Sequence, residues 1–348
     1  MTSALSAPGR LTRVHPLWAI EGGLLTIEGD GFTIDPLPSV RIGASLARVA
    51  HATPTALTAL VPAGLDGGST PVRLDDVPGE TAYVEIGAPL AAGVHLVDNP
   101  AFDRHGNLYV TLSGSRGERT PVAIFVVRPD GSREPFVTDI PNPTSLAFDA
   151  EGRLYVSSRF DGSVYQVDTD GRATLFASDL GVACGLAFGP DGLLYVGDRS
   201  GSVLRVNADG VATVVASLPP SVAAFHLAFG PDEALYVSAP TLSSHDVVYR
   251  VDASGDVSVC CRGFGRPQGL AFDAAGRLYV ADALAGSSGV FRVRIGEEAP
   301  PELVLAGGSV IGLAFDPHGG LAVASAETVY RLQTGDRGLL PPGTVDSG

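Results

Sequence analysis

"GLAFDAAGRLYVAD" spans residues 269–282, and near copies of it occur elsewhere, among them "GLAFGPDGLLYVGD" at 185–198 and "SLAFDAEGRLYVSS" at 145–158. Six copies align on one phenylalanine, which falls at Phe102, Phe148, Phe188, Phe229, Phe272 and Phe315. The successive spacings are 46, 40, 41, 43 and 43 residues, within the range that indicates an array of repeated supersecondary units. This repeat decides the fold of most of the chain.

Each copy predicts a four-stranded antiparallel sheet. A short apolar run ("GLAF") meets a turn containing glycine ("DAAG", "GPDG") and then an alternating run ("RLYVAD"), which is typical of a β-hairpin. A third run ("SVYQVD") and a fourth ("ATLFAS") follow in the same way. Four to eight such sheets bury both faces when they pack radially around an axis. Six copies therefore predict a six-bladed β-propeller in an all-β chain.

The last copy predicts how the ring closes. After "TVYRLQ" it continues as "TGDRGLLPPG", which is a poor fourth strand. A segment near residues 85–96 stands directly before the first copy, where a fourth strand fits the order of the repeat. We expect this segment to complete the last blade.

Composition excludes several classes of function. The chain has 348 residues and a formal net charge of −15, and all 23 of its basic residues are arginine. A nucleic-acid or anionic-membrane surface needs a positive footprint, so neither partner is expected. The absence of lysine excludes Schiff-base catalysis by that residue.

The N-terminus and the cysteines indicate a cytoplasmic protein. "MTSALSAPGRLTRVHPLW" lacks a basic start followed by an apolar segment, so we expect no signal peptide. The three cysteines are Cys184, Cys260 and Cys261, an odd number without disulfide-rich spacing. Cys260 and Cys261 are adjacent, and a disulfide between neighbours is strained, so free thiols are expected.

The pattern P-x-G-L-A-F-D-x-x-G-x-L-Y-V-A-D at residues 267–282 resembles the NHL-repeat and SMP-30 (senescence-marker protein)/gluconolactonase propellers. The resemblance covers residues 88–335. The Trp-Asp signature of WD40 propellers is absent, since the one tryptophan, Trp18, precedes the repeats. The superfamily includes lactonases, lyases, synthases and binding modules, so the resemblance implies the fold more than an activity.

Residues 12–87 do not carry the repeat. Their alternating apolar runs, separated by glycine and proline turns, predict an immunoglobulin-like sandwich. "TIEGDGF" and "VRIG" resemble the IPT/TIG subclass of that fold, which implies Phe32 in the core and turns at Gly22, Gly23, Gly29 and Gly31. With few arginines, this domain is expected to be a spacer or docking module. Residues 1–11 and 336–348 are expected to be tails.

The position four residues before each repeat phenylalanine is expected to face the mouth of the central channel. It holds Asp98, Thr144, Cys184, Phe225, Gln268 and Ile311. The gluconolactonase resemblance implies a divalent cation there, held by Glu, two Asn and Asp from the first, third, fourth and fifth blades. Phe225 offers no ligand and Cys184 is too soft for calcium. We expect no metal, with Asp98 as the remaining candidate ligand.

A shift of one residue gives a different cluster. It brings Asp98, Cys184 and His226 around one axis, as a borderline metal site or a nucleophile–base arrangement. Alternation along a strand opposes the shift. His226 is therefore expected to pack between blades, and Cys184 to behave as a small apolar residue. Asp98 and His226 remain the catalytic candidates.

Loops after the second strand of each blade are expected on the same face as the mouth. Their polar residues are Arg116, Glu118, Arg119, Arg159, Asp161, Asp198, Arg199, His245, Asp246, Asp282 and Glu327. The longest loop, "SGSRGERTP", holds two arginines, and arginine forks recognise carboxylates or phosphates. Asp198 and Asp282 are repeat-equivalent and are expected to cap turns. The predicted binding set is Asp98, Asn99, Thr144, Cys184, Phe225, His226, Gln268, Arg116, Arg119, Arg159, Asp198 and Asp282.

Two functional hypotheses follow. The first is a non-catalytic propeller that binds a small molecule or a protein at the mouth and rim loops, without a cofactor. The alternative is a gluconolactonase-like hydrolase with a degenerate central metal or acid–base site, in which a cation such as calcium sits in the channel.

Overall fold

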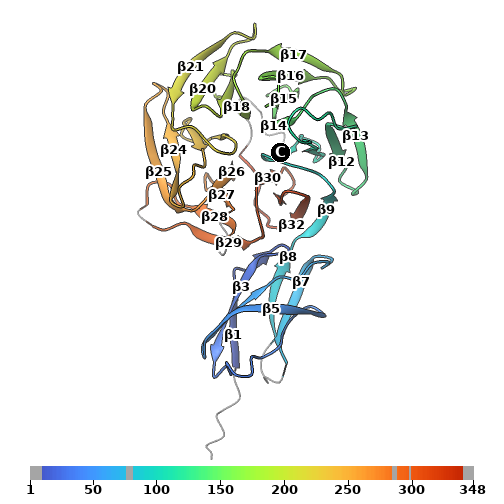
Figure 1. Cartoon of the computed structure of the whole chain (residues 1–348), viewed down its shortest axis with the longest axis vertical. Helices are drawn as coiled ribbons and strands as arrows, with labels where there is room; N and C mark the ends of the chain where they lie inside the picture. The colour runs from blue at the N-terminus through green and yellow to red at the C-terminus, as the bar shows by residue number, and fades with distance from the viewer. Residues whose placement is uncertain (1–9, 76–80, 284–287, 298, 340–348) are drawn as a thin grey trace, which may run out of the picture.

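The chain is all-β, as the sequence predicts. The structure is a computed structural model that describes residues 10–75, 81–283, 288–297 and 299–339. A ring of six blades surrounds a central axis, and an N-terminal sandwich lies beside the ring (Figure 1). The described residues form no helix of the length and hydrophobicity that a bilayer crossing requires.

Each blade is an antiparallel meander of four strands, with its first strand near the axis and its last at the rim (Figure 1). Blades one to three comprise β10 (Ala101–Phe102), β11 (Leu108–Thr111), β12 (Ile124–Val127) and β13 (Arg133–Val137); β14 (Pro143–Phe148), β15 (Leu154–Ser158), β16 (Ser163–Val167) and β17 (Ala173–Ala177); and β18 (Ala183–Phe188), β19 (Leu194–Asp198), β20 (Ser202–Val206) and β21 (Ala212–Ser217). Blades four to six comprise β22 (His226–Phe229), β23 (Leu235–Ser238), β24 (Asp246–Val251) and β25 (Val257–Phe264); β26 (Pro267–Phe272), β27 (Leu278–Asp282), β28 (Gly289–Val293) and β29 (Glu302–Ala306); and β30 (Gly312–Asp316), β31 (Gly320–Ala324), β32 (Thr328–Leu332) and β9 (Ala88–Ala92).

The ring closes through β9, which confirms the predicted closure. β9 comes from the start of the propeller sequence and pairs antiparallel with β32 from its end, with Ala91 opposite Val329. The outermost strand of the last blade is therefore supplied by the chain segment that enters the first blade. The six sheets close into a ring in this way.

The repeated tyrosine and phenylalanine hold neighbouring blades together. The Tyr of each "LYV" run packs edge-to-face on the Phe of the next blade, with ring centroids 4.9 to 5.2 Å apart in five such pairs. The junction of blades six and one differs, because Ala322 stands where the other blades have tyrosine. That junction is packed instead by small aliphatic side chains, including Ala91, Ala324 and Val329.

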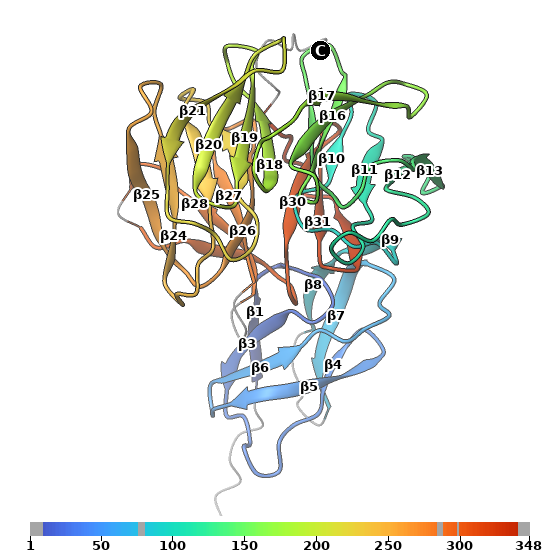
Figure 2. The ribbon, with the colours of Figure 1, turned by 45° about the horizontal axis from the view of Figure 1, so that its top comes forward.

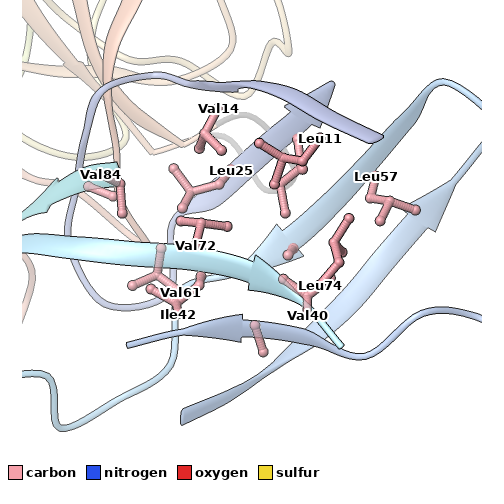
Figure 3. Close-up of a cluster of buried hydrophobic side chains, with 14 of the residues drawn as sticks. Leu11, Val14, Leu25, Val40, Ile42, Leu57, Val61, Val72, Leu74 and Val84 are labelled. Atoms are coloured by element: carbon pink, nitrogen blue, oxygen red, sulfur yellow. The ribbon is translucent and has the colours of Figure 1, made fainter. Parts of the chain in front are cut away.

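The N-terminal sandwich is built from β1 (Arg10–His15), β3 (Leu24–Asp30), β4 (Val40–Ile42), β5 (Ser45–Ala52), β6 (Ala56–Leu60), β7 (Gly68–Leu74) and β8 (Ala82–Ile86). Alternate residues point inward, as in β3, where Leu25 and Ile27 are fully buried. Figure 3 shows side chains from both layers meeting in this core. Phe32 is buried there, as the sequence predicts.

A short strand joins the sandwich to the ring. β2 (Trp18–Ala19) lies parallel to β8 on one side and to β29 of blade five on the other. The result is one twelve-stranded sheet that runs from the sandwich into blade five. Ile20 is fully buried against blade residues such as Leu305 and Leu332. In Figure 2 the sandwich extends from the side of the ring next to β9.

The chain after β32 crosses the face of the ring where the inner strands end, opposite the mouth, where they begin. Asp336 accepts a hydrogen bond from Arg277 at 2.7 Å, and the Leu339 N–H donates to the Phe272 carbonyl at 3.0 Å. Leu339 also lines a cavity of about 270 Å³ at this end of the channel, together with leucines and phenylalanines of the repeat. The expected tail of residues 336–348 is thus bound to blade five as far as Leu339, and the rest lies outside the described residues.

Deleting residues 336–348 is expected to lower the free energy of unfolding by about 1–3 kcal/mol, because two backbone hydrogen bonds and a partly exposed ion pair are lost. Urea denaturation measures the change. Deleting only residues 340–348 keeps each of these contacts and is the matched control. Equal effects of the two deletions would contradict a role for the 336–339 contacts.

Candidate functional site

Three polar side chains meet at the upper end of the channel, where the first strands of the blades begin. His226 Nδ1 lies 2.5 Å from Asp98 Oδ1, and its Nε2 lies 3.1 Å from Oε1 of Gln268. The side chains of His226 and Asp98 are 0% and 3% exposed. Asp98 Oδ1 also accepts the Asn99 N–H at 2.7 Å. This Asp98–His226–Gln268 line crosses the ring from blade one to blades four and five.

The start of the inner strand in blade four is paired differently from that of three other blades. In blades two, three and five the inner strand carries a bulge just before the repeat leucine. The described pairing of β22 with β23 has none, and His226 lies directly opposite Ser238. The expectation that alternation keeps His226 away from Asp98 was therefore wrong. Strand alternation holds for regular strands, and the starts of these inner strands are irregular.

The position three residues before the repeat phenylalanine, one after the predicted one, also makes contacts around the axis. Three blades have glycine there, namely Gly185, Gly269 and Gly312, and the others have Asn99, Ser145 and His226. All three side chains bond across blades, as when Asn99 donates to the Leu270 carbonyl and accepts from the Leu313 N–H, both at 2.9 Å. Glycine at 269 makes room for this, since a Cβ there would lie 2.0 Å from Asn99 Oδ1.

Two of the residues predicted at the mouth, Phe225 and Thr144, are buried in the structure. Phe225 is fully buried in the hydrophobic cluster of blades three and four, beside Val203 and Leu227. It is therefore a core residue and not a mouth residue, because His226 takes the inward direction in this blade. Thr144 is 1% exposed, and its hydroxyl donates to the Asn142 carbonyl at 3.2 Å.

Cys184 lies between the Asp98–His226–Gln268 line and the rim. Burial, more than any other cause, raises the pKa of its thiol to about 12, and the Asp98 charge acts in the same direction. Arg199 and Arg159 act in the opposite direction. A thiol with so high a pKa stays protonated at neutral pH and is a poor nucleophile. This fits the apolar role expected from the sequence.

Three rim arginines, from blades one, two and three, are near enough for their charges to act on one another, and Arg159 and Arg199 also act on Cys184. Burial lowers the pKa of Arg159, and the like charges of Arg199 and Arg116 lower it further. The Arg159 guanidinium donates to the Gly114 carbonyl at 3.4 Å, and that of Arg199 donates to the Ser221 carbonyl at 3.3 Å. Among the described residues none of the three has a carboxylate within ion-pair distance. We call Arg116, Arg159 and Arg199 the arginine cluster.

Asn142 shapes the loop that carries Arg116, and the sequence reasoning did not identify it. It is 1% exposed and has a φ of 43°, a conformation that asparagine tolerates better than most residues. Its side chain accepts the Gly117 N–H at 2.7 Å and donates to the carbonyls of Gly114 and Ser115. The Asn-Pro pair in "IPNPTS" was the available signal, since Asn-Pro favours a turn.

The remaining predicted residues interact with other groups. Burial, followed by the hydrogen bond to Asp161, raises the pKa of Tyr165 to about 12, and the charge of Arg119 opposes that rise. Asp198 accepts the Val182 N–H at 2.8 Å, and Asp282 accepts the N–H groups of Gly265 and Arg266. Both aspartates serve the backbone of inter-blade loops.

The residues at the mouth do not fit the divalent cation that the gluconolactonase resemblance implies. Phe225 points into the core, and the Asp98 carboxylate is already occupied by His226 and the Asn99 N–H. Over the described ranges, no three His, Cys, Asp or Glu side chains are grouped as a metal site requires. Asp98 alone is not a site for a hard cation, which takes six or more oxygen ligands in the case of calcium.

The N-terminal part matches one known domain family over residues 10–84. Those residues are an IPT/TIG domain. The IPT/TIG domain accounts for the sandwich, and it is followed by a propeller of the kind found in gluconolactonase, SMP-30 and NHL-type proteins. The sequence finds no match among curated proteins.

Solved structures share the fold of the propeller, and one of them covers nearly the whole chain. An auxiliary nutrient binding protein from Bacteroides ovatus is 16% identical, with 96% of this chain and 99% of that chain covered, at a TM-score of 0.52. A gluconolactonase from Xanthomonas campestris is 17% identical over 87% of this chain and 98% of its own, at 0.59. Regucalcin from Agrobacterium tumefaciens, a calcium-binding protein, is 21% identical over 74% and 96%, at 0.58. At these identities the likeness concerns the fold, and the first match spans both the IPT/TIG domain and the propeller.

Proposed function

We propose that this protein binds a small anionic ligand at the mouth of the propeller, through a carboxylate or phosphate group held by the arginine cluster. The observation that carries the proposal is the grouping of Arg116, Arg159 and Arg199 without a carboxylate partner among the described residues. Guanidinium groups form bidentate hydrogen bonds with carboxylates and phosphates.

The charges around Arg159 support this ligand class. Burial and two neighbouring like charges lower the pKa of Arg159, so an anion placed among the three groups would relieve both effects. Several arginines elsewhere in the propeller, among them Arg153, Arg250 and Arg292, have acidic partners. In a chain of net charge −15, this small positive region is distinctive and draws anions toward the mouth.

Exposed apolar groups on the loop of Arg159 and on the corresponding loop of blade four suit a ligand that also has an apolar part. Phe160 follows Arg159 and is 49% exposed, and Leu242, in the loop after β23, is 92% exposed. Exposed hydrophobic side chains beside polar ones are typical of binding surfaces. The likeness to auxiliary nutrient binding proteins of Bacteroides supports a binding role at the level of the fold.

Catalysis of the gluconolactonase type is the second candidate, and it has one supporting observation. The Asp98–His226 pair has the geometry of an oriented base. Both ring nitrogens of His226 are occupied, however, and its side chain is 0% exposed. A general base must reach the proton that it removes, so the structure favours binding over hydrolysis.

Arg159→Gln is expected to weaken binding of an anion by about 10- to 100-fold, which corresponds to the loss of one charged hydrogen bond of about 1.5–3 kcal/mol. Isothermal titration with inorganic phosphate, succinate and citrate measures the affinity. Arg119→Gln is the matched control, because the charge of Arg119 acts on Tyr165. Failure of all three anions to bind, or equal losses in both variants, would refute the anion site.

Elemental analysis and a lactone-hydrolysis assay on the same purified sample separate the two candidates. Binding predicts no stoichiometric divalent metal and no turnover. A stoichiometric cation together with turnover would favour the hydrolase.

A further inference from the structure

The last strand of every blade contains a β-bulge at the same place. In blade three, Val203 pairs with Ala216 and the next residue, Leu204, pairs with Val214, so one residue of β21 is extra. The same shift occurs in the other five blades. A bulge sets two successive residues against one on the neighbouring strand and interrupts the alternation of side chains.

The bulge turns two adjacent side chains onto the same hydrophobic cluster in each blade. The pairs are Phe136 and Val137, Phe176 and Ala177, Val215 and Ala216, Val304 and Leu305, and Leu90 and Ala91, with Cys260 and Cys261 in blade four. In five blades both residues are apolar. Only blade four has polarizable thiols at both bulge positions.

The two thiols of blade four come from adjacent residues at the bulge, and both pack on the same hydrophobic cluster. Their hydrogen bond lowers the pKa of Cys260, and the same bond, followed by burial, raises the pKa of Cys261. Both side chains are partly exposed on the outer strand β25, next to Val257 and Val259, which are 39% and 40% exposed. Reagents in solution therefore reach a pair of thiols that the fold holds side by side.

We infer that Cys260 and Cys261 form a dithiol site that chelates a thiophilic centre, such as a trivalent arsenical, through both sulfurs. Two sulfurs bonded at about 2.3 Å to one pyramidal arsenic atom lie about 3.5 Å apart, a separation that two adjacent side chains on the same side of a strand can reach. The bulge supplies this arrangement before the ligand arrives, so little ordering is needed on binding. The site is independent of the mouth.

The reaction with phenylarsine oxide is balanced without a redox partner. Two As–S bonds form, the arsenic–oxygen bond is lost, and the two thiol protons leave with that oxygen as one water molecule. Arsenic stays trivalent and neither sulfur is oxidised. The thiol with the lowered pKa, Cys260, provides the first thiolate, and Cys261 closes the chelate.

Phenylarsine oxide added to the folded, full-length protein is expected to bind with a stoichiometry of one, as measured by intact mass under native conditions. Titration with a thiol-specific dye should show that two accessible thiols disappear together. Cys260→Ser and Cys261→Ser are each expected to weaken binding by roughly 10²- to 10⁴-fold, because the second bond becomes intermolecular or is lost.

Two controls keep the result independent of folding. Cys184→Ser should bind the arsenical as the parent protein does, since Cys184 is buried in another blade. A double variant, Cys260→Val with Cys261→Ala, reproduces the bulge pair of blade three and should fold normally but not bind. Single variants that bind within about threefold of the parent, or loss of binding in Cys184→Ser, would overturn the inference.

Discussion

Asp98→Ala is expected to lower the free energy of unfolding by about 2–3 kcal/mol, the usual cost of losing a hydrogen bond to a carboxylate and leaving its buried partner unsatisfied. Asp98 is 3% exposed, and its carboxylate faces His226 at 2.5 Å. Its removal leaves the histidine ring without that partner inside the protein, where water does not replace it. The midpoint of urea denaturation, with an unchanged slope, measures the loss.

A matched acidic residue provides the control for this experiment. Asp209 lies exposed in a turn of blade three, so Asp209→Ala should change stability by no more than about 0.5 kcal/mol. A double-mutant cycle with His226→Ala should show a coupling of about 0.5–3 kcal/mol between the two side chains. Additive effects, or equal effects of Asp98→Ala and Asp209→Ala, would show that the contact contributes nothing.

Ala91→Asp is expected to be at least as disruptive, with a loss of about 3 kcal/mol or more. Ala91 is 4% exposed in β9 and packs in the seam between blades six and one. An aspartate there would place a carboxylate among the buried aliphatic side chains of the seam, which also lacks the tyrosine–phenylalanine pair of the other junctions. The strand that closes the ring thus lies at the junction that lacks the aromatic pair of the other five.

Ala92→Asp tests whether the effect comes from the seam. Ala92 is the next residue of β9, it is exposed, and its carbonyl accepts a hydrogen bond from Arg133. Aspartate at this position faces solvent and should change stability by about 0.5 kcal/mol or less. Thermal unfolding of both variants side by side gives the comparison, and similar losses in both would contradict a buried seam.

The ring could be predicted from the sequence because the repeat indicates both the strands of each blade and the number of blades. The positions of the six repeat phenylalanines mark the six blades. The incomplete last copy indicates that an earlier segment closes the ring. The IPT/TIG domain was also recognisable from its glycine turns. These features depend on local patterns that recur or that resemble a known family.

The candidate site was harder to predict, because it depends on departures from the pattern. Asp98, His226 and Gln268 were identified as candidates, but no residue in "AAFHLAF" announces the different strand pairing or the direction of His226. Asn142 acts through the backbone of a loop 25 residues away in sequence. The grouping of Arg199 with Arg116 and Arg159 depends on how three consecutive blades pack side by side.

The junction at β2 determines how firmly the IPT/TIG domain is joined to the ring. Trp18 and Ala19 are hydrogen-bonded on both edges, to the IPT/TIG domain and to blade five, and the joint therefore resists bending in the way that a strand inside a sheet does. The IPT/TIG domain is a rigid handle fixed at the side of the ring. A surface or partner attached to the IPT/TIG domain would therefore hold the mouth of the propeller at a constant angle and distance from itself.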